Sequence, residues 1–224
     1  MEQCKANTMV CQRHLEYLEQ IIKEINLSSI DGSIVECGVW KGGCCMWMML
    51  CQKKFGENRP FFLYDTFDGM TYPANDKDAG EAKTIFNRIS DKLYKRDYDK
   101  WHNENKWAYA PLELVQANIH SINYDASKIS YVKGDINTTL DSTLPESIAV
   151  LRLDTDWYDS TKKELTMLFP LVAKGGYIIV DDYYAWKGSR VATDEFMSIH
   201  RDKVTIVDKN ITGGHFVLKK TSPV

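Results

Sequence analysis

The sequence predicts an α/β protein built on a doubly wound, mostly parallel sheet. Short apolar runs of strand length alternate with longer segments of helical periodicity along the 224 residues, as expected for strand–helix–strand units. The last two apolar runs flank Gly213-Gly214 and indicate a closing hairpin, so one antiparallel strand pair is expected at that edge. This length suits one large domain, and we expect residues 1–224 to form a single domain.

Each expected element follows from a local signal. Leu15, Leu18, Ile22 and Ile25 recur at helical spacing, so residues 1–30 are expected to form a helical extension before the sheet. The expected strands are residues 33–37, 61–65, 129–133, 148–153, 176–180, 204–207 and 215–219. The expected helices are residues 8–26, 41–54, 112–122, 160–169 and 190–199.

Residues 69–128 interrupt the strand–helix alternation. This segment is polar, contains scattered aromatic residues and has few strand signals, apart from an amphipathic helix that begins after Pro111. Insertions of this length in a compact domain are usually functional. We therefore expect a helical lid that shapes a ligand pocket.

Composition excludes several classes of function. A formal net charge of −3 disfavours a nucleic-acid partner bound through bulk charge. No apolar run approaches the roughly 20 residues that a membrane span requires, and the first residues lack the apolar segment of a signal peptide. The six cysteines form no CxxC pair, so we expect small buried side chains rather than disulfides or a zinc site. These features predict a cytoplasmic protein that acts on a small molecule.

The first expected strand ends in a glycine-rich turn, ECGVWKGG. Such a turn between strand and helix is typical of nucleotide-like ligands, but Trp40 stands where the dinucleotide motif has the glycine that admits a pyrophosphate. Glu36 would repel a phosphate and attract a sulfonium cation, so the turn favours S-adenosylmethionine over NAD or FAD. A turn whose glycines serve packing alone is the alternative. The candidate cofactor contacts here are Glu36, Gly38, Gly42 and Gly43.

The next two strands also end in acids. Asp65, followed by Thr66, lies where a doubly wound fold places the carboxylate that binds ribose hydroxyls. Asp135 and Ile136 follow the third strand, where the acid is placed to accept from an adenine amino group and the isoleucine to pack on the ring. Asp135 is equally suited to cap the helix after it, and both interpretations stay open.

Four carboxylates follow the fourth and fifth strands, in VLRLDTD and IIVDDY. Carboxyl ends of parallel strands share one edge of a sheet, so Asp154, Asp156, Asp181 and Asp182 are expected to crowd one rim. A hard divalent cation with oxygen ligands would relieve their repulsion, and Mg²⁺ suits such a set. The best metal ligands are Asp154, Asp181 and Asp182, and Asp154 is also a candidate cofactor contact. The alternative is that these acids cap the following helices.

These blocks, in this order, resemble the macrocin O-methyltransferase family (TylF/MycF-like) over residues 32–219. The resemblance rests on ECGVWKGG, LYDTFDGM, VKGDINTTL, LRLDTDWYDST and GGYIIVDDYYAWKGSRVATDEF. It implies a Rossmann-like class I methyltransferase sheet of seven strands and methylation of sugar hydroxyls with S-adenosylmethionine and Mg²⁺. It also implies self-association, as a homodimer or a higher homo-oligomer. The site residues implied are Glu36, Gly38, Asp65 and Asp135 for the cofactor, and Asp154, Asp181 and Asp182 for the metal.

The expected reaction needs a base that removes a proton from the acceptor hydroxyl. Asp154 is the first candidate for that base, Asp156 the second, and His102 in the insertion the third. The expected acceptor is a sugar-like or other polyol small molecule. An aromatic diol of the catechol type is one alternative, and a non-catalytic protein that binds S-adenosylmethionine is another.

Overall fold

The computed structural model describes residues 1–96, 106–209 and 215–222. Its centre is a seven-stranded sheet in the order β3-β2-β1-β4-β5-β7-β6. The first five strands along the chain pair in parallel, whereas β7 pairs antiparallel with both β5 and β6. The predicted doubly wound sheet with an antiparallel C-terminal pair is therefore confirmed.

The strands agree closely with the predicted ranges. They are β1 (Ser33–Cys37), β2 (Phe61–Asp65), β3 (Ile129–Lys133), β4 (Ile148–Leu153), β5 (Val172–Val180), β6 (Val204–Lys209) and β7 (Phe216–Lys220). The helices are α1 (Glu2–Lys5), α2 (Gln12–Leu27), α3 (Gly43–Lys54), α4 (Ala79–Arg96), α5 (Leu112–His120), α6 (Ile136–Thr139), α7 (Tyr158–Leu168) and α8 (Lys187–His200). The short 3-10 turns are η1 (Asp76–Asp78), η3 (Ala126–Lys128) and η4 (Phe169–Leu171). Strand β5 begins before the predicted residue 176, because a register shift in its pairing with β4 accommodates the Gly175-Gly176 pair.

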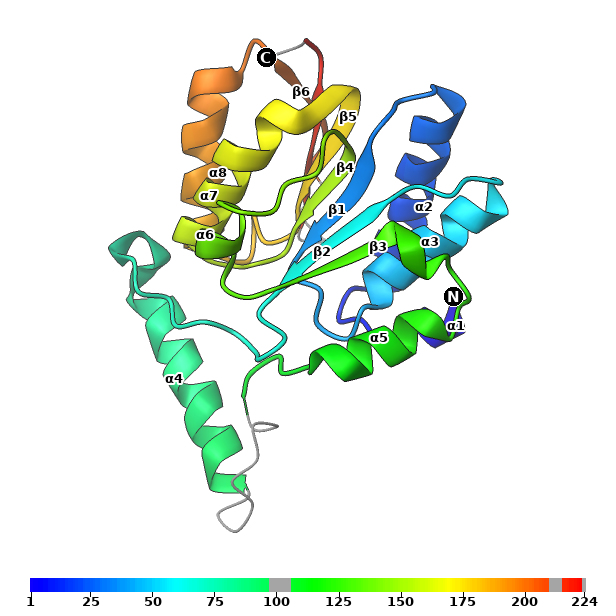
Figure 1. The fold of residues 1–224 in the computed structure, drawn as a ribbon. Coiled ribbons are helices and arrows are strands. Elements are labelled where there is room, and N and C mark those ends of the chain that lie inside the picture. The colour runs from blue at the N-terminus through cyan, green and yellow to red at the C-terminus, as the bar shows by residue number, and fades with distance from the viewer. Residues whose placement is uncertain (97–105, 210–214, 223–224) are drawn as a thin grey trace.

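Helices cover both faces of the sheet, with α6, α7 and α8 on one side and α2, α3 and α5 on the other (Figure 1). The apolar stripe of α2, including Leu18 and Ile22, is buried in the core on its side together with Ile34 of β1. Helices α7 and α8 bury Leu165 and Phe196 in the second core. The apolar face of the leading helix is thus used within the chain itself. Self-association stays a prediction.

The predicted insertion has two parts. Helix α5 buries Val115 and Ile119 in the core beside α3, so the last part of residues 69–128 belongs to the body of the fold. Helix α4 instead extends away from the sheet (Figure 1). Its first end is fastened by the buried Asp78, whose carboxylate accepts from the backbone N–H of Tyr158 at 2.7 Å. A lid formed by the earlier part of the insertion stays a prediction.

Helices long and apolar enough to cross a membrane are absent from the described part of the chain. The six cysteines are free, and five of them are buried as predicted. Cys11 is exposed.

Candidate active site

The site lies where the strand order reverses, between β1 and β4. Chain segments leave these two strands in opposite directions, and ligands of open α/β sheets bind in the crevice that results. Gly38 has φ +84°, and a Cβ on it would lie 1.9 Å from the carbonyl oxygen of Asp154. Only glycine permits this contact between the turn after β1 and the segment after β4.

A cavity of about 610 Å³ opens over this crevice. One part is lined by the glycine turn and by the ends of β2 and β3, including Glu36, Gly38 and Ile136. The other part is lined by the segments after β4 and β5 and by Trp107 of the insertion. The cavity therefore joins the predicted cofactor region to the rim of carboxylates.

Asp65 braces the glycine turn. Its Oδ2 accepts from the backbone N–H groups of Val39 at 2.7 Å and Trp40 at 3.0 Å. Its Oδ1 accepts from the backbone N–H of Phe67 at 2.7 Å. Trp40 adopts φ +48°, a left-handed conformation that is unusual for a bulky residue. The hydrogen bonds that the turn donates to Asp65 help to hold Trp40 in this conformation.

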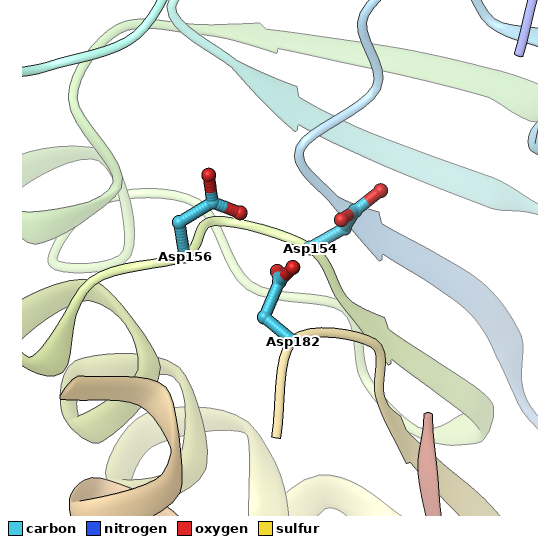
Figure 2. A group of neighbouring side chains, drawn as sticks. All are labelled: Asp154, Asp156 and Asp182. Atoms are coloured by element: carbon cyan, nitrogen blue, oxygen red, sulfur yellow. The ribbon is translucent and has the colours of Figure 1, made fainter. Parts of the chain in front are cut away.

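Three carboxylates meet at the cavity rim. Asp154, Asp156 and Asp182 each offer an oxygen, and these three atoms lie within 4.8 Å of one another (Figure 2). Asp154 and Asp156 come from the segment after β4 and Asp182 from the segment after β5. We call these three residues the acid triad. Asp156 has φ +67°, and this left-handed turn of the backbone is one that aspartate tolerates better than most residues.

The acid triad is electrostatically unfavourable when all three groups are ionised. Burial raises the pKa of Asp154 to about 6, even though the Arg152 guanidinium opposes the shift. Burial also raises the pKa of Asp156 to about 7, and the neighbouring Asp154 carboxylate adds to the rise. The pKa of Asp182 lies well above its ordinary value for the same two reasons, burial first and the charges of Asp156 and Asp154 second. A bound cation would remove this penalty.

Asp181, which the sequence placed with Asp154 and Asp182 as a metal ligand, lies outside the acid triad, and its role as a ligand stays a prediction. Its Oδ2 lies 3.0 Å from Arg152 Nη2, and its Oδ1 lies 3.3 Å from Nδ1 of the buried His14. Asp181 therefore faces Arg152 and His14, whereas the adjacent Asp182 faces Asp154 and Asp156. Asp156 takes the third place instead.

Arg152 is a functional residue that the sequence reasoning missed. Its side chain is 1% exposed, and Nη1 lies 2.7 Å from Oε1 of Glu36 and 2.8 Å from Oδ2 of Asp154. With Asp181 as its third partner, Arg152 ties the end of β1 to the ends of β4 and β5. The sequence does contain a signal for this residue, because Arg152 is a lone arginine inside an apolar strand. A buried arginine almost always has charged partners, so its position indicates an ion pair in the fold.

Comparisons with known proteins agree with this geometry. The family model of macrocin-O-methyltransferase (TylF) matches residues 3–216. The chain belongs to this family. It is 30% identical to the demethyldecarbamoylnovobiocin O-methyltransferase of Streptomyces niveus, with 92% of this chain and 72% of that protein covered. It is 26% identical to the mycinamicin III 3''-O-methyltransferase of Micromonospora griseorubida, with 91% and 76% covered.

The solved structure of the O-methyltransferase NovP superposes with a TM-score of 0.81 and 27% identity, covering 96% of this chain and 83% of that one. The predicted class I methyltransferase fold is thereby confirmed. As a member of the macrocin-O-methyltransferase family, the protein is an O-methyltransferase that uses S-adenosylmethionine as its methyl donor.

The structure separates the predicted cofactor residues of this methyltransferase into two groups. Those that line the cavity are Glu36, Gly38, Asp65, Thr66, Asp135, Ile136 and Asp154. Gly42 and Gly43 are not among the described residues that line the cavity, and a cofactor contact for either stays a prediction. Gly43 packs against the N-terminal segment, where a Cβ would lie 2.6 Å from the Asn7 carbonyl oxygen. Gly42 is the N-cap of α3 and Gly43 its first residue, so both glycines also serve the start of that helix.

The roles of two lining acids are constrained by their contacts. Asp135 caps α6, because its Oδ1 accepts from the backbone N–H of Asn137 at 2.9 Å. Burial raises the pKa of Glu36 to about 7 against the opposing effect of Arg152. A cofactor contact for Asp135, and for Asp65 with its oxygens bonded to the turn, stays a prediction. His102 lies outside the described residues.

Proposed function

We propose that this methyltransferase transfers the methyl group of S-adenosylmethionine to a hydroxyl of a sugar-like small molecule, with Mg²⁺ held by the acid triad. The acid triad is the observation that carries the proposal. It stands at the rim of the cavity that also contains the glycine turn, so a cofactor and an acceptor hydroxyl have room in one crevice. The relatives methylate a novobiocin precursor and mycinamicin III according to their names, which supports a natural-product acceptor.

The acid triad fits a hard divalent cation. Its donors are carboxylate oxygens alone, the ligand type that Mg²⁺ prefers, with room for water or substrate to complete the shell. The Oδ2 atom of Asp182 is buried and has no hydrogen-bond partner within the described residues. Such a buried acceptor is costly unless a ligand or water satisfies it. When bound, the cation supplies positive charge that lowers the pKa of an acceptor hydroxyl and fixes its position.

The chain's own residues have separable tasks. Arg152 holds one oxygen of Asp154, which leaves Asp154 oriented and partly neutralised. Asp156 offers a carboxylate oxygen beside those of Asp154 and Asp182, which places it to take a proton from an acceptor hydroxyl bound at the triad. Because Arg152 already engages one oxygen of Asp154, the first candidate from the sequence, we propose the second candidate, Asp156, as the base. The tight approach of Gly38 to Asp154 keeps the glycine turn beside the triad.

The test is a mass-spectrometric assay for added methyl groups. The purified protein, S-adenosylmethionine and a panel of neutral glycosides and catechols are incubated with Mg²⁺ or with EDTA. We expect methylated glycosides with Mg²⁺ and none with EDTA, and loss of turnover in Asp182→Asn. Asp31→Asn, at an exposed acid that is not among the residues lining the cavity, is the matched control. Full turnover in EDTA would refute the metal, and methylation of catechols alone would replace the acceptor class.

The predicted partners and location are further proposals. We propose a homo-oligomer, to be tested by light scattering coupled to size-exclusion chromatography. A cytoplasmic location is tested by fractionation of the source cells.

A further inference from the structure

Five aromatic side chains form a continuous strip that begins beside the acid triad. The ring centroids of Trp157 and Trp186 lie 5.1 Å apart, and each lies 6.0 Å from that of Trp107. Trp107 is followed by Phe86 of α4 at 5.9 Å, and Phe86 by Tyr72 at 5.4 Å. We call these five residues the aromatic strip. It runs from the sheet edge to the projecting helix α4.

One end of the aromatic strip is tied to the triad by the backbone. Trp157 directly follows Asp156, and the backbone N–H of Trp186 donates to the carbonyl of Asp182 at 2.9 Å. Trp157 is 4% exposed, and its indole N–H donates to the carbonyl of Thr71 at 2.9 Å. Trp157 is therefore a fixed support. Trp107 and Trp186 are only half-buried against it.

Trp107 borders two hollows. It lines the cavity that contains the acid triad, and it also lines a second cavity of about 420 Å³ together with Phe86. The two cavities share the segment that begins at Thr66 and includes Gly69 to Thr71. The backbone N–H of Met70 donates to the carbonyl of Trp107 at 2.8 Å, which ties the backbone of Trp107 to the segment that both cavities share. A ligand seated at the triad can therefore extend along Trp107 towards Phe86.

The charges around the aromatic strip disfavour an anionic ligand. Among the described residues that line the larger cavity, Arg152 is the one basic side chain, and three carboxylates already surround it. Lys106, in the second cavity, forms an ion pair with Asp68. The remaining charged groups are acids. An uncharged, flat ring system suits aromatic walls of this kind better than a phosphate does.

We propose that the aromatic strip binds a flat, apolar, uncharged group attached to the acceptor sugar, and that Trp107 determines specificity for that group. This inference rests on the proposed sugar methylation. The sugar hydroxyl lies at the acid triad, and the attached ring system packs on Trp107 and Phe86. Stacking on these side chains removes apolar surface from water and makes offset or edge contacts between rings. Neither contact touches the cofactor part of the cavity.

The test compares two glycosides of the same 6-deoxyhexose, one carrying a methyl group and the other the fluorescent 4-methylumbelliferyl ring. Binding is followed by fluorescence anisotropy of the ring with S-adenosylhomocysteine and Mg²⁺ present, and by competition with the methyl glycoside. Turnover is followed by mass spectrometry. We expect the umbelliferyl glycoside to bind about tenfold more tightly than the methyl glycoside, as a few ring contacts provide. Trp107→Ala should abolish this preference, and Trp107→Phe should retain most of it.

A matched pair of variants separates the aromatic strip from general packing. Phe86→Ala should reduce the preference, whereas Phe55→Ala, at the end of α3, should leave it unchanged. Affinity for S-adenosylhomocysteine should be the same in all variants, which shows that they fold. Binding of the umbelliferyl glycoside without turnover of any glycoside would support the binding role of the aromatic strip and refute the proposed function. Turnover with no preference, or a preference that survives Trp107→Ala, would overturn the role of the strip.

Discussion

Mg²⁺ should stabilise the native protein much more at high pH than at low pH. The reason lies in the acid triad, where burial raises the pKa of Asp154 to about 6 and that of Asp156 to about 7. In the metal-free protein the native state holds protons that the unfolded chain has already released. Native stability therefore falls as the pH rises from about 4 to about 7, and a cation that replaces the protons restores it.

The magnitude follows from the same shifts. A rise in the pKa of Asp156 from 3.8 to about 7 corresponds to about 4 kcal/mol for ionising this group in the native site. Mg²⁺ at a concentration of about 100 times its dissociation constant raises the free energy of unfolding by about 2.7 kcal/mol. For a chain of this size, that free energy raises the melting temperature by about 5 to 10 °C.

Differential scanning fluorimetry with and without saturating MgCl₂ is the assay, with NaCl at matched ionic strength as the control. We expect the full rise at about pH 8 and a rise of less than about 2 °C at about pH 5, where the triad is largely protonated. Asp156→Asn should reduce the rise at high pH, and Asp135→Asn should not. An equal effect of Mg²⁺ at both pH values, or an undiminished effect in Asp156→Asn, would refute the reasoning.

Three further substitutions probe the support of the site. Gly38→Ala should lower the melting temperature and abolish S-adenosylhomocysteine binding by calorimetry, because its Cβ would lie 1.9 Å from the Asp154 carbonyl oxygen; normal binding would contradict the close approach. Asp65→Asn should weaken that binding about tenfold, as expected for a turn that loses charge-assisted hydrogen bonds; unchanged affinity would exclude Asp65 as the brace. Burial raises the pKa of Glu164 to about 8, so native stability is lost as the pH rises towards that value. In urea titrations between about pH 5 and pH 8, Glu164→Gln should remove about 3 kcal/mol of this loss. Parallel pH profiles of the variant and the original protein would contradict this role of Glu164.

The sequence determined the sheet almost completely. β1, β2, β3 and β4 begin and end at the predicted residues, because buried parallel strands are short apolar runs bounded by turn residues. The antiparallel closing pair was equally visible. The location of the site also followed from sequence, since acids that end neighbouring parallel strands must share one edge of the sheet.

Tertiary structure decided which of these acids act together. The order of residues places Asp154, Asp156, Asp181 and Asp182 at one rim, but it does not give the direction of each side chain. The backbone at Asp156 is left-handed, and its carboxylate lies beside those of Asp154 and Asp182. Asp181 is drawn to a buried arginine instead.

The ion pair of Arg152 with Glu36 and the aromatic strip also could not be predicted from the sequence. Arg152 and Glu36 are 116 positions apart in the chain, and the strip joins residues of the insertion to the segments after β4 and β5. Periodicity and turn signals report interactions between residues close in sequence. Charge pairing and ring contacts between distant segments depend on distances and orientations that exist only once the sheet has brought its strand ends together.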